Sequence, residues 1–376
     1  RVLGVAAHER DHGAGAEVLV DDENLHAELV YKPAGVVGAI GPWNWPPLMI
    51  TIWQIGPSLR MGNTVVAKPS EYTPPLSVLA LLAVMNDVLP ADVLIGISGD
   101  REVGARLASH PRHRQDHVHG IHRDRTEDHR ELGRNLARLT LELGGNDAGI
   151  VLPGTDPAAI AEDLFWGAFI NTGQTCAAMK RLYVHDSLYD QVVDALAGIA
   201  ANVPIGNGLD EGNVLGGPLQ NKQQFDIVSR LVEDAKARGA RIATGGEAAP
   251  ELGELFYRPT IVADIPNDAA LVQEEQFGPA LPIIRYSDVD EAFALANSVD
   301  VGLGARCGRA IPRLRGRRRH GCSPAPCDQL PRRPAPDGSL RRREELGLRA
   351  RVRRRRPQVG RGAAGRLRAR PEELSR

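Results

Sequence analysis

Short apolar runs alternate with amphipathic segments over the first part of the chain, from residue 28 to residue 111. Runs of β-branched and small residues predict strands, and apolar residues at helical spacing predict the helices between them. The predicted elements are a strand and loop over 28–50, a helix over 52–63, a strand over 64–70, a helix over 76–90 and a strand over 93–99. Helices that alternate with strands favour a doubly wound α/β fold with a parallel sheet.

The pattern stops at Arg112, resumes at Asn135 and ends at Ala305. Within the second patterned part, two strands joined by a glycine turn are predicted over 135–154. A helix, a loop, a strand and a second helix are predicted over 157–200, and a further helix and strand over 225–246. Periodicity is not expected beyond Ala305, where arginine, proline, glycine and alanine dominate.

Composition adds limits to this picture. The chain has 376 residues, a formal net charge of −1 and 42% hydrophobic residues, which is typical of a soluble two-domain protein and not of a polyanion-binding one. No apolar run is long enough to predict a membrane span. The chain starts at Arg1 without a signal segment, so we expect it to lack its true beginning and to be cytoplasmic. Of the four cysteines, only Cys176 lies in patterned sequence, which disfavours a disulfide framework.

Three residues are candidates for acyl chemistry. Cys176 follows a glycine-containing turn, where nearby backbone N–H groups would favour its thiolate, although a small buried cysteine has the same pattern. Glu142 ends an apolar strand, where burial would raise its pKa toward that of a general base; an ion-paired glutamate is the alternative. Asn44 lies in a rigid loop and could donate to an oxyanion, or could only satisfy its own turn.

Five motifs place these candidates in one known pattern. GPWNWP, VVAKPSEYTPP, LTLELGGND, NTGQTC and EEQFGPALPI occur in this order. The chain thereby resembles the aldehyde dehydrogenase superfamily over 28–111 and 135–305. The resemblance implies oxidation of aldehydes to carboxylic acids with NAD(P)⁺, on an α/β fold with a Rossmann-type cofactor domain, a catalytic domain and an oligomerisation arm. Dimers or tetramers are usual among similar proteins.

The resemblance also implies roles for single residues. Cys176 would attack the aldehyde carbon to give a thiohemiacetal, whose oxyanion Asn44 and the Cys176 backbone N–H would hold. Loss of hydride to the nicotinamide would leave a thioester, and Glu142 would activate the water that hydrolyses it. A CoA-acylating relative, in which a thiol releases the acyl group, is an alternative that Glu142 disfavours.

Cofactor contacts follow from the same motifs. Lys68 and Glu71 match residues at the adenosine ribose, and a carboxylate there favours NAD⁺ over NADP⁺. Glu275 and Phe277 match residues around the nicotinamide, and Gly99 a turn beside the cofactor; an acidic turn and a core phenylalanine are the alternatives for the first two. The remaining cofactor candidate is Trp43, which with Trp45 could wall the cleft or simply pack.

Residues 112–134 depart from the family pattern. The stretch holds five histidines interleaved with six arginines, so a closed metal shell is disfavoured and no metal is predicted. A buried strand is implausible because unpaired charges are costly to bury. Back-translated and read one base further on, 112–130 can give GIDKITFTGSTATGRKII, which resembles the missing family strand and its phosphate-binding turn. We therefore expect a shifted reading frame here.

The tail behaves in the same way, because shifted frames of 306–376 give INSHAALPPTVPFGGVKSSG and EFGVEGLKS, similar to the closing motifs of the family. The sequence thus predicts an NAD-binding domain over 1–143, a catalytic domain over 144–305 and an aberrant arginine-rich tail over 306–376, with the oligomerisation arm truncated or scrambled. The literal chain could then be an inactive product with a disordered tail, and we expect neither specific nucleic-acid binding nor a membrane partner.

Overall fold

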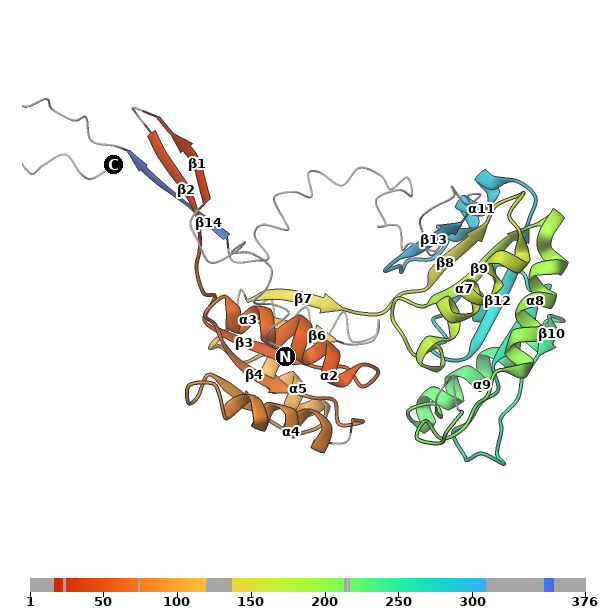
Figure 1. Cartoon of the computed structure of the whole chain (residues 1–376), viewed down its shortest axis with the longest axis horizontal. Helices are drawn as coiled ribbons and strands as arrows, with labels where there is room; N and C mark the ends of the chain where they lie inside the picture. Colours follow the sequence, from red (N-terminus) through yellow and green to blue (C-terminus); the bar gives the residue numbers. More distant parts are fainter. Residues whose placement is uncertain are drawn as a thin grey trace, which may run out of the picture.

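The computed structural model describes residues 17–22, 25–73, 75–119, 137–212, 215, 217–308 and 348–354. Two α/β bodies, each built on its own sheet, lie side by side, and a narrow β arm projects from them (Figure 1). The chain passes from the first sheet to the second between Glu142 and Asp147. No helix in the described ranges is long and apolar enough to cross a membrane.

The first body is a five-stranded sheet in which every neighbouring pair is parallel, in the order β5-β4-β3-β6-β7. Its strands are β3 (Val36–Ile40), β4 (Thr64–Lys68), β5 (Leu94–Gly96), β6 (His113–His119) and β7 (Arg138–Glu142). Its helices are α2 (Pro46–Leu48), the π-helix η1 (Met49–Ile55), α3 (Gly56–Arg60), α4 (Pro75–Asn86) and α5 (Arg101–Ala108). Val37, Ala39, Val65 and Ala67 of the central strands form its core with Leu82 of α4, as the apolar runs predicted.

β6 corrects the expectation that no strand forms in the histidine-rich stretch. Residues His113–His119 pair in parallel with β3 on one side and β7 on the other. The expectation weighed the charge of the side chains, whereas the ladder is made by main-chain groups that every non-proline residue carries. The rest of the predicted aberrant stretch, 120–134, lies outside the described residues.

The helix predicted over 52–63 is present but begins earlier and winds differently. A continuous helical segment runs through α2, η1 and α3, and its middle seven residues form a π-helix. It ends at Arg60, just before Gly62 with φ of 77°, as the Gly-Asn signal predicted. π-helical turns occur mostly as short bulges near functional sites, and this one starts five residues after Asn44.

The second body is a six-stranded sheet in the order β10-β11-β12-β9-β8-β13, parallel except for β10. Its strands are β8 (Asp147–Val151), β9 (Met179–His185), β10 (Arg241–Thr244), β11 (Thr260–Ala263), β12 (Ala280–Tyr286) and β13 (Ala305–Gly308). Its helical segments are α7 (Pro157–Phe169), η4 (Ile170–Gly173), η5 (Asp186–Leu188), α8 (Tyr189–Asn202), α9 (Lys222–Ala237), α10 (Ala270–Gln273) and α11 (Val289–Ala296).

Both faces of this sheet are buried, which explains its continuous apolar strands. Along β12, Ala280 and Ile284 face the side covered by α9 and α11. Leu281 and Ile283 face the opposite side, which α7 and α8 cover. Alternate residues of a strand point to opposite faces, so one strand serves two cores.

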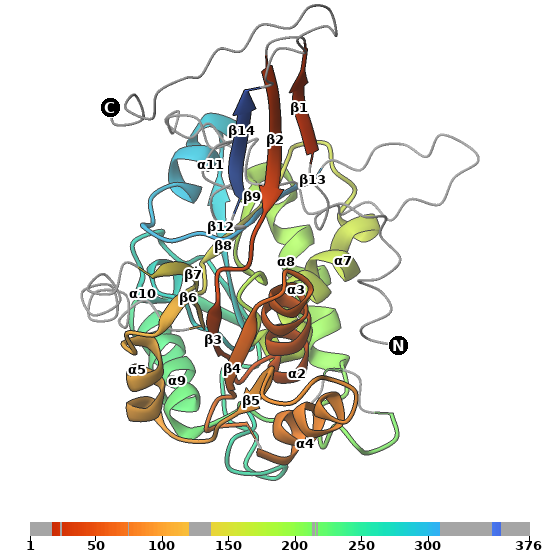
Figure 2. The same cartoon turned by 90° about the vertical axis from the view of Figure 1, so that its left-hand side faces the viewer.

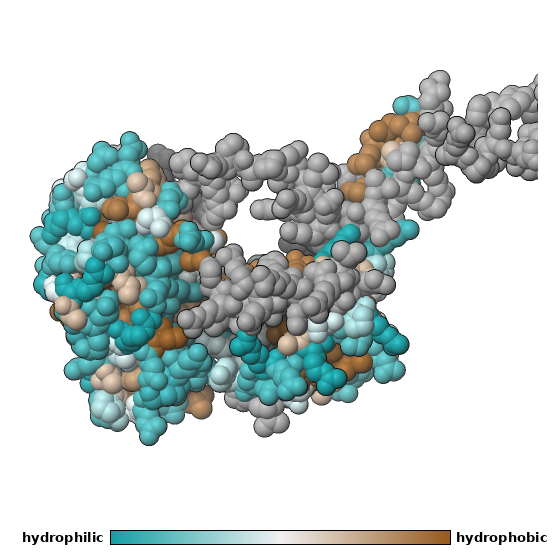
Figure 3. Space-filling model, turned by 180° about the vertical axis from the view of Figure 1, so that it is seen from behind, coloured by the Kyte–Doolittle hydropathy of each residue, from teal (hydrophilic) through white to brown (hydrophobic). Residues whose placement is uncertain are grey.

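The projecting arm is an antiparallel sheet of β1 (Glu17–Asp21), β2 (Leu25–Tyr31) and β14 (Leu348–Arg354), which lie side by side in Figure 2. Two strands correct the prediction that periodic structure ends at Ala305. In the second body β13 extends to Gly308, and in the arm β14 pairs with the whole of β2. Main-chain pairing again outweighs an unfavourable composition. Val18 and Leu19 are about half exposed, and apolar surface is visible on the arm in Figure 3.

Candidate active site

The thiol of Cys176 follows a sharply bent loop between α7 and β9. Asn171, Thr172 and Gly173 of η4 have φ angles of 53°, 57° and 72°. A Cβ atom at Gly173 would collide with the main chain of Gly278, so glycine is required for this close approach. The chain therefore turns tightly, which brings the Gln174 carbonyl group and the Thr175 hydroxyl group toward the first body.

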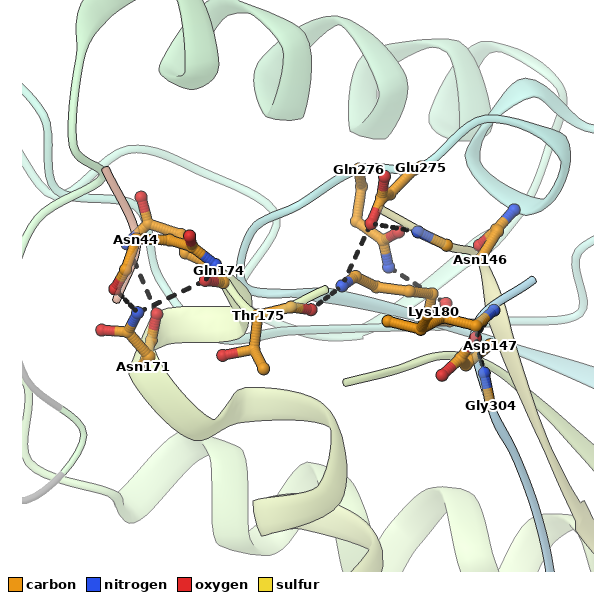
Figure 4. A network of polar contacts seen from close by, with 12 residues as sticks. Asn44, Asn146, Asp147, Asn171, Gln174, Thr175, Lys180, Glu275, Gln276 and Gly304 are labelled. Carbon is orange, nitrogen blue, oxygen red and sulfur yellow. Dashed lines mark hydrogen bonds and ion pairs between the residues drawn. The ribbon is translucent and has the colours of Figure 1, made fainter. Parts of the chain in front are cut away.

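Asn44 joins this loop from the first body through reciprocal hydrogen bonds (Figure 4). Its Nδ2 donates to the carbonyl oxygen of Gln174 at 3.0 Å, and Nδ2 of Asn171 donates to the Asn44 carbonyl oxygen at 2.9 Å. Nearby, Trp45 Nε1 donates to Oγ1 of Thr175 at 3.1 Å. The structure thus brings Asn44 and the Cys176 loop together, with one amide N–H of Asn44 engaged by a carbonyl oxygen.

A cavity of about 340 Å³ opens beside this junction. Both bodies contribute to its walls: Trp43 and Asn44 from the first, Asn171, Gln174, Pro218, Leu219, Gln220 and Leu255 from the second. A larger cavity, of about 420 Å³, lies against α5 and contains none of the predicted site residues. The smaller cavity is therefore the one relevant to the thiol loop.

The Cys176 thiol is partly buried, and burial raises its pKa above the ordinary value. The backbone N–H of Ala177 and the charge of Lys180 lower the pKa, whereas the charges of Glu142 and Glu275 raise it. The expectation of a favoured thiolate is therefore wrong for this structure. No helix begins at Cys176, so helical N–H groups do not offset its desolvation.

Glu142 is the last residue of β7 and is half-buried. Burial raises the pKa of its carboxyl group, in the direction that its apolar strand predicted. Gly144 and Gly145 follow, and a Cβ atom at Gly144 would collide with the Glu275 carboxylate. Without side chains at these two glycines, the main chain after β7 can pass close to Glu275 of the second body.

Glu275 is held on that side by two donors. The backbone N–H of Gly145 donates to Oε1 at 3.3 Å, and Nζ of Lys180 lies 3.5 Å from the same oxygen. Burial nevertheless raises the pKa of Glu275 to about 7. Phe277, at φ of 45°, meets the Trp43 ring edge to face at 5.3 Å, so these two predicted cofactor residues lie together.

Lys68 and Glu71 form an ion pair at the end of β4. Nζ of Lys68 lies 3.1 Å from Oε2 of Glu71, and the Lys68 residue is only 2% exposed. Gly99 lies before α5, and a Cβ atom there would collide with the side chain of Val103. Asp100 caps α5 by accepting from the N–H groups of Glu102 and Val103. These residues border the first body at the carboxyl ends of its strands, where α/β sheets bind ligands.

Comparison with known proteins decides the family. Residues 1–307 match the model of the aldehyde dehydrogenase family. The chain belongs to the aldehyde dehydrogenase family. It is 38% identical over 293 residues to phenylacetaldehyde dehydrogenase of Pseudomonas fluorescens, and this alignment covers 76% of this chain and 57% of the relative.

Two solved structures have the same fold. The Mycobacterium tuberculosis aldehyde dehydrogenase complexed with NAD⁺ is 32% identical, with a TM-score of 0.77 over 82% of this chain and 64% of that one. An NADP-dependent enzyme of E. coli is 33% identical, with a TM-score of 0.74 over 80% of this chain and 62% of that one. The chain spans about 60% of the length of the curated relatives that it matches.

Several polar residues of the site were not singled out by sequence reasoning. Asn171, Gln174 and Thr175 anchor the thiol loop, and Lys180 lies buried against Glu275. Their signal was present, because NTGQTC is a polar run between apolar elements and Lys180 interrupts an apolar strand. Among the described residues, no cluster of three His, Cys, Asp or Glu side chains could hold a metal ion.

Proposed function

We propose that this chain oxidises an aldehyde to a carboxylic acid with NAD⁺ through a covalent intermediate on Cys176. The observation that carries the proposal is the hydrogen bond from Asn44 Nδ2 to the carbonyl oxygen of Gln174. It holds an amide donor of one body beside the nucleophile loop of the other, as oxyanion stabilisation requires. Family membership supplies the reaction class.

In this mechanism the thiolate sulfur of Cys176 bonds to the aldehyde carbon as the carbonyl π bond breaks, and the carbonyl oxygen becomes an oxyanion. The second N–H of Asn44 and the Cys176 backbone N–H donate to that oxyanion. Trp43, Phe277 and Glu275 would hold a nicotinamide, which would supply the hydride acceptor, and loss of hydride from the tetrahedral carbon then leaves a thioester on Cys176. Glu142 then takes a proton from water, the water oxygen attacks the thioester carbon, and the C–S bond breaks to release the acid and the Cys176 thiolate, after which Glu142 loses its proton to solvent.

The residues at the first body fit a dinucleotide. Glu71 offers a carboxylate to ribose hydroxyls, Lys68 holds it at 3.1 Å, and Gly99 lets the chain pass close against Val103 at the start of α5. Trp43 and Phe277 would flank the nicotinamide, with Glu275 at its ribose. A carboxylate at the adenosine ribose repels a 2′-phosphate, which favours NAD⁺; NADP⁺ is the alternative.

Cys176→Ala tests the proposal directly. The variant should lose aldehyde-dependent NADH formation, while its affinity for NAD⁺, followed by quenching of tryptophan fluorescence, should match that of the wild type. Unchanged binding shows that the fold survives. Retained NADH formation in this variant would rule out the assignment.

A CoA-acylating reaction differs only in the group that releases the acyl chain. Glu142 lies half-buried at the end of β7 with a raised pKa, as a base that activates water requires. NADH formation should therefore proceed without CoA. A rate that depends on CoA would favour the acylating alternative.

The same proposal includes a shifted reading frame over 112–134 and 306–376. For the tail, support comes from the family match, which ends at residue 307, close to where the sequence pattern is lost; residues 112–134 lie within the match, and there the proposal rests on the sequence alone. Resequencing of the locus and mass spectrometry of tryptic peptides test it. Peptides containing the family-like reading would identify a sequencing error. Peptides of the literal sequence would show that the altered chain is made; an inactive product is then the alternative to the proposed oxidation, and an assay of aldehyde-dependent NADH formation decides between them.

Beyond the reaction, a small aldehyde is the proposed partner, and no specific nucleic acid is expected. Similar proteins form homodimers or homotetramers. The apolar side chains exposed on β1 of the arm would suit such an assembly. A cytoplasmic location remains part of the proposal.

A further inference from the structure

Lys180 is a lysine buried in the second body. Its side chain is 1% exposed, and it lies on β9, four residues after Cys176. A buried ammonium group is costly to desolvate, and burial lowers the pKa of Lys180. Such a group persists only where its surroundings compensate for the lost water.

Three groups of different kinds surround the Lys180 ammonium, and two of them, Thr175 and Glu275, are drawn in Figure 4. Nζ donates to the carbonyl oxygen of Thr175, the residue before Cys176. It lies 3.5 Å from Oε1 of Glu275 and 4.8 Å from the centre of the Phe277 ring. Lys180 therefore contacts the nucleophile loop and two predicted cofactor residues at once.

The charged groups that act on this lysine are few. Glu275, Asp147 and an ionised Cys176 each favour its protonated form. Asp147 is already engaged as an acceptor for the N–H groups of Leu303 and Gly304, at 2.9 and 2.8 Å. Three acidic groups thus share the charge of Lys180, and Glu275 is the one that forms an ion pair with it, at 3.5 Å.

We propose that Lys180 is a positioning residue whose buried ammonium group favours the anionic form of Cys176, and that Glu275 competes with the thiol for that group. This inference rests on the proposed function only in taking Cys176 as the nucleophile. It assigns Lys180 two effects: its charge stabilises the sulfur anion, and its hydrogen bond fixes the Thr175 carbonyl group.

Removal of the Lys180 charge and removal of the Glu275 charge should then shift the pH midpoint of Cys176 alkylation in opposite directions. In Lys180→Met, a nearly isosteric side chain removes the charge, so the midpoint of Cys176 alkylation should rise by about one pH unit. At pH 7.5 the rate of alkylation by iodoacetamide should fall about tenfold. In Glu275→Gln the competing anion is lost, and the midpoint should fall below that of the wild type.

The measurement follows alkylation of the Cys176 peptide by mass spectrometry across pH 6–10, with the other three cysteines as internal references. Lys222→Met is the matched control, because Lys222 is exposed and pairs with Asp226 on its own helix. Its alkylation profile should equal that of the wild type.

A purely structural role for Lys180 predicts a different result. Both variants would then lower the melting temperature without moving the alkylation midpoint, or would move it in the same direction. Either outcome overturns the proposal, and if Lys180→Met does not fold, Lys180→Gln, which removes the charge but keeps an amide donor for the Thr175 carbonyl oxygen, is measured in its place. Because alkylation needs no aldehyde turnover, this test is independent of the proposed oxidation.

Discussion

Asn44 donates a 3.0 Å hydrogen bond from Nδ2 to the carbonyl oxygen of Gln174, although the two residues are 130 positions apart in sequence. The bond links a loop after β3 to the loop that carries Cys176, and Asn171 returns a bond to the Asn44 carbonyl oxygen. The amide is therefore held before any substrate arrives. Preorganised donors of this kind need little rearrangement during the reaction.

Asn44→Ala should lower kcat by roughly 10²–10³-fold, because removal of one oxyanion donor has an effect of that size. The variant also loses the bond to Gln174, which should reduce the free energy of unfolding by about 1 kcal/mol. Asn202→Ala is the matched control, since Asn202 donates a 2.8 Å bond to the Gly198 carbonyl oxygen on α8, in the second body. Steady-state rates and thermal melts of both variants separate the two effects; equal rates would contradict the role of Asn44.

Glu142→Gln should permit the first half of the reaction and block the second. An amide cannot take a proton from water, so one equivalent of NADH should form rapidly and turnover should then be slow. In the wild type, hydrolysis should decline as the pH falls through the raised pKa of Glu142, because only the ionised carboxylate is a base. Stopped-flow absorbance detects the burst, and Glu162→Gln on the exposed side of α7 serves as control.

Two glycine substitutions should have opposite effects on stability. Gly173→Ala places a Cβ atom against the main chain of Gly278 at a φ of 72°, so we expect a loss of at least about 1–3 kcal/mol and a disturbed thiol loop. Gly198→Ala, inside α8, meets no atom within 4 Å. It should gain about 0.5–1 kcal/mol from helix propensity. Urea unfolding of both variants measures the difference.

Glu71→Gln should change the cofactor preference. The ratio of kcat/KM for NAD⁺ to that for NADP⁺ should fall several-fold, because the carboxylate no longer repels a 2′-phosphate and Lys68 loses its 3.1 Å partner. Asp226→Asn breaks the exposed ion pair with Lys222 and should leave this ratio unchanged. An unaltered ratio in Glu71→Gln would place the adenosine ribose elsewhere.

Much of the fold could be predicted because burial on two faces leaves a clear pattern. The apolar run at 64–70 and the segment at 76–90 became β4 and α4, with small differences at their ends. The π-helix η1 could not be predicted, since seven residues are too few to separate its periodicity from that of an α-helix. β6 was missed because side-chain charge says little about main-chain pairing.

The candidate site divides in a similar way. Cys176, Glu142 and Asn44 could be singled out by residue type and flanking motif. The loop anchors Asn171 and Gln174 depend on contacts across 127 and 130 residues, which no local pattern encodes. The raised pKa of Cys176 depends on how completely the two bodies exclude water, and that too is a tertiary property.

The position of β7 at the edge of its sheet has a kinetic consequence. Its sheet neighbour is β6, where His119 is the register partner of Glu142. Weak pairing between β6 and β7 would therefore leave the Glu142 carboxylate poorly positioned, while the Cys176 thiol, which lies on the other body, stays in place. Changes at 113–119 should thus produce acylated protein that persists, so the lifetime of the thioester reports how firmly these two strands hold together.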